Sequence, residues 1–358
     1  MTATPAQESL VEAYRSGASE LPGSGVSWID DLRDRSLRQF EATGLPTGRE
    51  EAWRHTPLGP IHRLSFRAGA NGGSADRAPS RLGSAYWMVI DPSGNVSSSA
   101  LPNGLVVRSL RDDLDGARGW LGRLVDLESP GVGALNTALF DRGIWIEVAP
   151  GTTLDRPVHL VHTLGPSDAP SAAFPRILVV FGENAQGVIV EQYDGSAGNA
   201  PTLTAPVSEI FLGPGARLDH IRLQKESDQA FHLGSLVAEQ SAGSRFRSWS
   251  LAFGGKLARV DIETKLAGEG AECSLEGIFA ARGGQHLDHY TRIEHVSPHT
   301  ESRETYKGIL GGRARGVFLG HIIVRPNAQK INANQTSRSI VLSQGARVNM
   351  KPWLEIYA

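Results

Sequence analysis

Histidine and cysteine are the residues of this sequence that could bind a metal ion or act as nucleophiles. The chain of 358 residues contains 11 His and one Cys. His159 and His162 lie three residues apart in a segment expected to be a strand, and so do His286 and His289. Side chains alternate between the two faces of a strand, so neither pair can bind one ion together. Both pairs are therefore predicted to be hydrogen-bonded structural histidines.

The densest group of potential metal ligands follows His289. His295 has the same parity along the strand, and Glu294, His299 and Glu301 are close to it in the sequence. A proline interrupts the strand before His299, however. A catalytic metal needs three rigidly held ligands, which a single strand seldom supplies. We therefore expect no tight mononuclear metal site here.

Cys273 is the one thiol of the chain, so no internal disulfide can form. An iron–sulfur cluster usually takes four thiolates, and one thiolate cannot hold it. Cys273 lies in a segment rich in small residues and is predicted to be buried and inert. The motifs GxSxG, HExxH and CxxC do not occur in the sequence. These features predict that the chain is not a self-sufficient enzyme.

Composition and charge indicate a globular protein with a large core. The chain has 40% hydrophobic and 21% charged residues and a net charge of −2, which favours neither nucleic acid nor an anionic membrane as a partner. Residues 301–358 carry nine Lys/Arg against three Asp/Glu, typical of a contact with an acidic partner or of a solvated face. No run approaches about 20 apolar residues and no secretory signal is evident. We expect no membrane span and a cytoplasmic location.

Residues 1–140 are predicted to form an α-rich head with a few strands. Ser27 is expected to cap a long helix that buries one apolar face and ends at Gly44. Three shorter helices are expected at residues 8–15, 46–58 and 129–140. In the second of these, Trp53 and His55 are predicted to pack the helix onto the head.

The rest of the head is predicted to be irregular or extended. Residues 68–80 are rich in Gly, Ala and Ser and predict a flexible loop. Residues 86–90 and 105–110 are short apolar runs bounded by turn residues, and they predict strands.

Residues 141–358 contain a repeat in which a glycine-containing turn is followed by a small residue and then a strand. The small residues are Ala185, Ala216, Ser244, Ala271, Ala314 and Ala346, with separations of 31, 28, 27, 43 and 32. A period near 30 with one insertion predicts a β-solenoid, because each coil buries its apolar face only against a stacked neighbour. The alternative is an antiparallel β-sandwich. Hairpin signals such as Asn-Gly are nearly absent, which favours the solenoid.

Several longer motifs stand in the C-terminal quarter of the chain. They are Thr291-Arg-Ile-Glu-His295, Tyr306-Lys307-Gly308-Ile309-Leu310, Val317-Phe318-Leu319-Gly320 and Lys351-Pro352-Trp353-Leu354-Glu355-Ile356. The head adds Arg49-Glu50-Glu51-Ala52-Trp53-Arg54-His55-Thr56. Together these runs resemble the SufB/SufD family of iron–sulfur cluster assembly scaffolds over roughly residues 30–358. The single cysteine favours the SufD branch, because SufB relatives carry cysteines in both regions.

This resemblance implies a mainly β fold, with a right-handed parallel β-helix core of the SufBD type at residues 141–358. It also implies pairing with a SufB-like subunit and attachment of the SufC-like ABC ATPase, with no nucleic-acid or membrane partner. No cofactor is expected on this chain alone, and a nascent iron–sulfur cluster would be shared at the interface with SufB. No catalytic or cofactor-binding residue is transferred from the family. Cys273 and His295 remain the candidates for sulfur or iron handling.

One departure from the family lies at the end of the sequence, which stops at Tyr357-Ala358. In the family this point is followed by a stretch with a Cys and a His-Gly pair, and then by a helical segment that binds SufC. We expect the C-terminal helical segment and the histidine lent to the cluster site to be absent, and SufC binding to be poor.

Two other functions of a solenoid or barrel are disfavoured by the sequence. A β-helix carbohydrate lyase would normally have a secretory signal, and a metal-dependent barrel enzyme would need a spacing such as HxH. The alternative that stays open is a non-catalytic structural β-solenoid that binds other protein partners.

Overall fold

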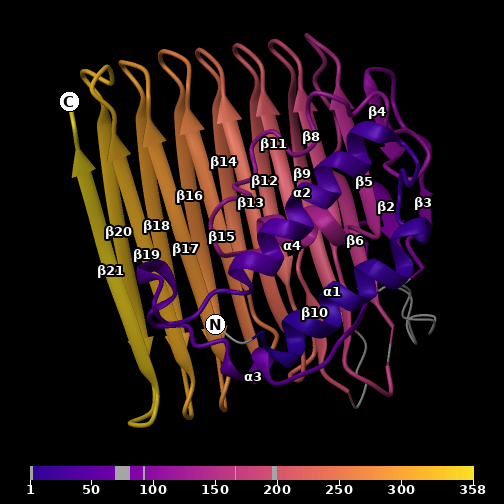
Figure 1. Ribbon diagram of the computed structural model, residues 1–358. Coiled ribbons are helices and arrows are strands. Elements are labelled where there is room, and N and C mark those ends of the chain that lie inside the picture. Colours follow the sequence, from indigo (N-terminus) through magenta and orange to yellow (C-terminus); the bar gives the residue numbers. More distant parts are fainter. Residues whose placement is uncertain (1–2, 69–80, 92, 166, 196–199) are drawn as a thin grey trace.

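The computed structural model describes residues 3–68, 81–91, 93–165, 167–195 and 200–358. It contains two long sheets, with helices packed over one of them (Figure 1). The expected loop at residues 68–80 lies, apart from Ala68, outside the described residues.

From β5 (Arg142–Val148) onward, and apart from two short side strands, successive strands alternate between the two sheets. The first sheet contains, in spatial order, β21 (Arg347–Ile356), β19 (Arg315–Val324), β17 (His286–His295), β15 (Leu257–Leu266), β13 (Phe231–Gln240), β11 (Val207–Leu212), β8 (Pro175–Phe181), β5 (Arg142–Val148) and β4 (Leu105–Ser109). The second contains β20 (Asn332–Val341), β18 (Glu301–Leu310), β16 (Glu272–Ala281), β14 (Arg245–Ala252), β12 (Arg217–Gln224), β9 (Gln186–Gly195), β6 (Val158–Leu164), β2 (Tyr86–Ile90) and β3 (Val96–Ser98). Three short strands join the first sheet at its side: β1 (Arg67–Ala68), β7 (Ser171–Ala173) and β10 (Thr202–Thr204).

Each turn of the chain therefore adds one strand to each sheet. From β5 onward all the strand pairings along the two sheets are parallel, and they form a β-solenoid of about seven turns. The prediction of a mainly β solenoid with an N-terminal helical region is confirmed.

The repeat near 30 residues is real, but the expected insertion is wrong. Ala271 precedes β16 in the second sheet, whereas Ala314 precedes β19 in the first sheet. Within the second sheet, Glu272 pairs with Glu301, which is 29 residues later. The separation of 43 residues is therefore one coil plus the step from one sheet to the other. The turns that lead into the two sheets use the same small buried residues, so they look alike in sequence.

Alternation along the strands builds the core between the sheets. Apolar residues of both sheets, such as Ile189 and Ile210, point inward and are fully buried. Coils also stack closely at their turns. A methyl group added to Gly213 would lie 3.0 Å from the backbone of Gly182 in the preceding coil, so any larger residue would crowd the stacked coils here.

The helices cover the outer face of the first sheet (Figure 1). They are α1 (Pro5–Gly17), α2 (Ser27–Thr43), α3 (Gly59–His62) and α4 (Val132–Leu139). The prediction that Ser27 caps α2 is wrong, because Ser27 is the first helical residue and Val26 precedes it without a side-chain cap. Gly44 ends the helix as expected, with φ 67°. No helix formed by the described residues is long and apolar enough to cross a membrane.

The segment expected as a helix at residues 46–58 contains only a 3₁₀ turn, Glu51–Trp53. Trp53 is buried in the core under the helices, and the Arg259 guanidinium of β15 lies 3.7 Å from its ring centre. Thr56 donates a hydrogen bond to Asp288 of β17. The packing prediction for Trp53 is thus only partly correct, since the segment also docks on the solenoid, while His55 is only half-buried.

Strands of the head region complete both sheets. β2 pairs in parallel with β6, and β4 pairs antiparallel with β5. Both expected head strands are therefore present. The boundary near residue 140 stays a prediction, because these pairings cross it.

Candidate functional site

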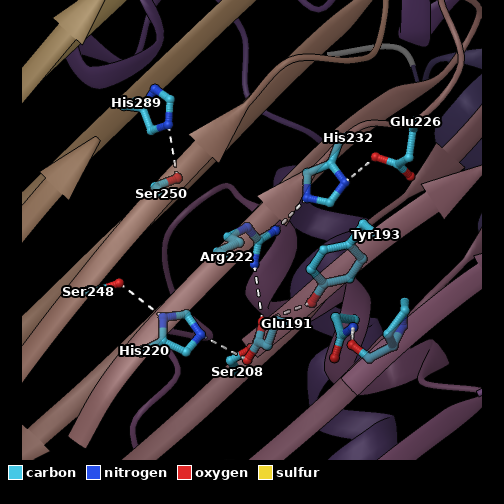
Figure 2. A network of polar contacts seen from close by, with 12 residues as sticks. Glu191, Tyr193, Ser208, His220, Arg222, Glu226, His232, Ser248, Ser250 and His289 are labelled. Atoms are coloured by element: carbon cyan, nitrogen blue, oxygen red, sulfur yellow. Dashed lines mark hydrogen bonds and ion pairs between the residues drawn. The ribbon is translucent and has the colours of Figure 1, made fainter. Parts of the chain in front are cut away.

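Buried charged and polar side chains occupy the space between the sheets in the middle coils (Figure 2). Glu191 comes from β9, Arg222 from β12 and His232 from β13. Each side chain is almost completely buried. In β12 the inward parity of Leu218 also brings Arg222 inside, so strand alternation places a guanidinium in the core.

Glu191 lies at the centre of this network. Its carboxylate accepts hydrogen bonds from Ser208 at 3.0 Å and from the Tyr193 hydroxyl at 3.1 Å. The His220 Nε2 atom is 3.3 Å away and the Arg222 guanidinium is 3.5 Å away. Burial alone raises the pKa of this carboxyl group, but His220 and Arg222 outweigh burial and lower the pKa to about 2. Glu191 is therefore ionised and fully surrounded by partners.

His232 connects this centre to a second carboxylate. Its Nδ1 lies 2.6 Å from Glu226 Oε2, and its Nε2 contacts the Arg222 guanidinium. Arginine can only donate, so Nε2 accepts and Nδ1–H donates to Glu226. Burial also lowers the pKa of His232, which keeps the imidazole neutral. Thr204 donates to the other oxygen of Glu226.

A histidine oriented by a carboxylate is the arrangement of a general base, but this one is occupied. A base must accept a proton from a nucleophile or from water, but the Nε2 atom of His232 already accepts a hydrogen bond from Arg222. The network is also closed to solvent, since Glu191, Arg222 and His232 are at most 1% exposed. The network therefore has a structural role: it balances buried charge and fixes the alignment of neighbouring coils.

His295, a predicted candidate, lies at the end of β17. Its Nδ1 is 2.7 Å from Thr300 Oγ1 and its Nε2 is 2.9 Å from Ser302 Oγ. Burial lowers its pKa to about 4, so the ring is neutral at physiological pH. Both ring nitrogens are used by hydroxyl groups, so neither is free for iron.

Cys273, the other candidate, points into the core from β16 and is 4% exposed. Burial raises the pKa of its thiol well above the usual range, so the reactive thiolate is disfavoured. The two candidates meet at Ser302, because Cys273 is its strand partner and His295 contacts its hydroxyl. Among the described residues, no group of three or more His, Cys, Asp or Glu side chains could hold a metal ion.

The paired histidines have separate roles, as their spacing predicts. His159 contacts Gln192, His286 contacts Thr56 and His289 contacts Ser250. The prediction of a hydrogen-bonded role is wrong for His162, because neither ring nitrogen has a hydrogen-bond partner within the described part of the chain. Its ring instead stacks on Tyr193, with 4.9 Å between the ring centres.

The last coil of the solenoid has an unusual surface. β20 and β21 each have one strand neighbour among the described residues, so one edge of each is unpaired. Val341, Leu354 and Ile356 follow the parity that faces the core in earlier coils, yet they are 46%, 58% and 61% exposed. Unpaired strand edges with exposed apolar side chains are a template for pairing with another chain.

Comparison with known proteins identifies the family. Residues 163–358, more than half of the chain, match the model described as SUF system FeS cluster assembly, SufBD core domain. The chain belongs to the SufBD family. The matched residues include the polar network, both predicted candidates and the last coil of this SufBD protein.

Curated relatives of this SufBD protein cover most of the chain. It is 29% identical to an iron–sulfur cluster assembly SufBD family protein of Synechocystis, over 98% of this chain and 78% of the relative. It is 28% identical to the iron–sulfur cluster assembly protein SufD of Escherichia coli, over 90% and 76%. It is 31% identical to the chloroplastic protein ABCI7 of Arabidopsis thaliana, over 60% and 46%. The predicted SufD-like resemblance is confirmed.

Sequence reasoning did not single out the residues of the polar network. Glu191, Arg222 and Glu226 carry no motif, and the chain gives only one sign of Arg222, which shares the inward parity of Leu218 in β12. That sign becomes readable only when the strand and its buried face are both assigned.

Proposed function

We propose that this chain is a SufD-like scaffold subunit of the SUF iron–sulfur assembly complex. It would pair with a SufB-like subunit and work with a SufC-like ABC ATPase in the cytoplasm. The family match and the SufD relative support the assembly role. The observation that carries the pairing is the last coil, where inward-facing apolar side chains are exposed beside two unpaired strand edges.

A partner with a similar solenoid would add its own strands to β20 and β21. Backbone hydrogen bonds across both edges would provide affinity, and burial of Leu354 and Ile356 would add apolar contact.

In this proposal the chain is not an enzyme, and the nascent cluster is cargo held together with the partner. The buried histidines of the middle coils support this role, because His232 has no nitrogen free for acid–base work. His295 and Cys273 are likewise enclosed, so a cluster would need ligands from the partner or from other parts of the interface.

The test is co-purification of this chain with a SufB-like and a SufC-like protein from one expression host. The double variant L354K/I356K should lose the SufB-like subunit, because two charges replace the apolar surface. The matched control I278K/I309K changes two exposed apolar residues, 43% and 44% exposed, on the outer face of the second sheet. It should keep the partner. Equal recovery with both variants contradicts pairing through the last coil, and no recovery with the wild type favours a solenoid that binds other proteins.

A further inference from the structure

A groove of about 490 Å³ lies between the head segment and the end of the first sheet. Arg54 and His55 line one side, and Arg315 of β19 and Arg347 of β21 line the other. Pro57, Val348 and Asn349 complete the lining, so no carboxylate is part of it. The buried polar network does not include these residues, whereas Arg347, Val348 and Asn349 lie at the start of β21 in the last coil.

The two arginines of the sheet are direct strand partners, because Arg315 pairs with Arg347 in the parallel register. Both are exposed, and neither side chain has an ion-pair or hydrogen-bond partner within the described ranges. Like charges opposite each other on neighbouring strands destabilise a sheet. An anion between the two guanidinium groups would remove this repulsion, and each planar guanidinium offers paired donors.

The opposite wall of the groove is held firmly in place. Lys351 of β21 binds Glu51 at 2.6 Å, and Arg259 donates to the Ala52 carbonyl at 2.6 Å. Thr56 is anchored to Asp288. These contacts fix the head segment on both sides of Arg54, although Glu51 also lies 3.6 Å from the Arg54 guanidinium. The wall is therefore formed before any ligand arrives, which reduces the entropic cost of binding.

We propose that this groove binds a phosphate-bearing small molecule. Its volume falls within the range of about 300–1,000 Å³ that is usual for small-ligand sites. The concave shape, made by two distant parts of the chain, suits a compact anion better than an extended acidic segment of a protein. Arg315 and Arg347, which have no ion-pair partner within the described ranges, match the charge and geometry of phosphoryl oxygens, and Arg54, which also lies near Glu51, adds a third guanidinium. The proposal accounts for part of the basic surplus in residues 301–358 and goes beyond the assembly role proposed above.

The experiment is isothermal titration of the full chain with inorganic pyrophosphate, without any partner protein, so its result is independent of SUF pairing. The double variant R315Q/R347Q should weaken binding about a hundredfold, because each missing guanidinium removes a charge-assisted hydrogen bond and lowers the affinity about tenfold. The single variant R54Q should weaken it about tenfold by the same reasoning. The control K307Q/R338Q removes another pair of exposed basic strand partners, on the outer face of the second sheet. It should change the affinity less than about twofold.

Several results would overturn the proposal. They are no measurable binding of pyrophosphate to the wild type, equal losses in the control and in R315Q/R347Q, or unchanged affinity in R54Q. Tighter binding of a hexaglutamate peptide than of pyrophosphate, abolished in R315Q/R347Q, would assign the groove to an acidic protein segment instead. Thermal unfolding of each variant checks that all of them fold.

Discussion

In the middle coils, the carboxylate of Glu191 is surrounded by the side chains of His220 and Arg222 and by two hydroxyl donors. Glu304 in the last coils is equally buried, but no cation faces it among the described residues. Burial lifts the pKa of Glu304 to about 7, while the pKa of Glu191 is lowered to about 2. The Tyr306 hydroxyl beside Glu304 also lacks a hydrogen-bond partner in the described structure. The same strand pattern therefore favours the ionised form of Glu191 and the protonated form of Glu304.

The difference shows what a solenoid interior needs in order to hold charge. Each coil can contribute a partner only to its immediate neighbours, so Glu191 is stable because β12 supplies both His220 and Arg222. Glu304 faces Leu275 on one side and Gln335 on the other in the strand register. The last coils therefore combine a less satisfied interior with exposed apolar edges, and we connect this region with partner binding.

Removing the cation at the centre of the middle network should have the largest effect. Arg222→Leu leaves the buried charge of Glu191 and the acceptor nitrogen of His232 without their shared partner. We expect a loss of about 3–5 kcal/mol in the free energy of unfolding, measured by urea denaturation. The control Arg247→Leu removes an exposed guanidinium that pairs with Asp219, and it should cost at most about 1 kcal/mol. Similar losses in both variants would mean that the network does not stabilise the coils.

Packing in the last coils should be the next most sensitive feature. A methyl group at Gly277 would lie 2.1 Å from the Tyr306 ring, so Gly277→Ala forces the ring or the strand to move. Overpacking of this kind costs about 1–3 kcal/mol. Gly284 has nothing within 4 Å of the same position, and Gly284→Ala should stay within about 0.5 kcal/mol of the wild type. Equal thermal stability of the two variants would show that Tyr306 is loosely packed.

The charge state of Glu304 gives a pH test. Its pKa is raised in the folded protein from 4.5 to about 7, so the folded state holds the proton more tightly. Its contribution to stability is therefore greatest below pH 4.5 and is lost as the pH rises through 7, with a slope on the order of 1 kcal/mol per pH unit. Glu304→Gln should remove this slope between pH 5 and 7 in chemical denaturation, whereas the exposed control Glu301→Gln should keep it. Parallel profiles for wild type and Glu304→Gln would contradict a neutral carboxyl group.

The smallest effect is expected at Cys273. Because the thiol is buried and its pKa is raised, a thiol-reactive disulfide should modify the native chain much more slowly than the urea-unfolded chain. Cys273→Ser should change stability by about 1 kcal/mol. Rapid modification of the folded chain would show that the last coils open readily and that Cys273 is available for chemistry.

The sequence was sufficient to predict the fold, because strand alternation and a recurring small residue at each turn are local signals. It could not tell which sheet each turn enters, and this is why the step from Ala271 to Ala314 looked like an insertion. The candidate Cys273 was correctly predicted to be buried. Most partners of Glu191 come from other strands of the solenoid, and Trp53 packs on Arg259 from a distant part of the chain. Contacts between distant segments leave no local pattern in a single sequence, so neither could be predicted.

The most direct test of pairing through the last coil is hydrogen exchange of the chain with and without a SufB-like partner. Amides of β20 and β21 should become protected in the complex, because their open edges gain strand partners. Amides of β3 and β4, at the opposite end of the two sheets, should exchange at the same rate in both samples. Protection confined to β3 and β4, or unchanged exchange of β20 and β21 in a stable complex, would contradict this account.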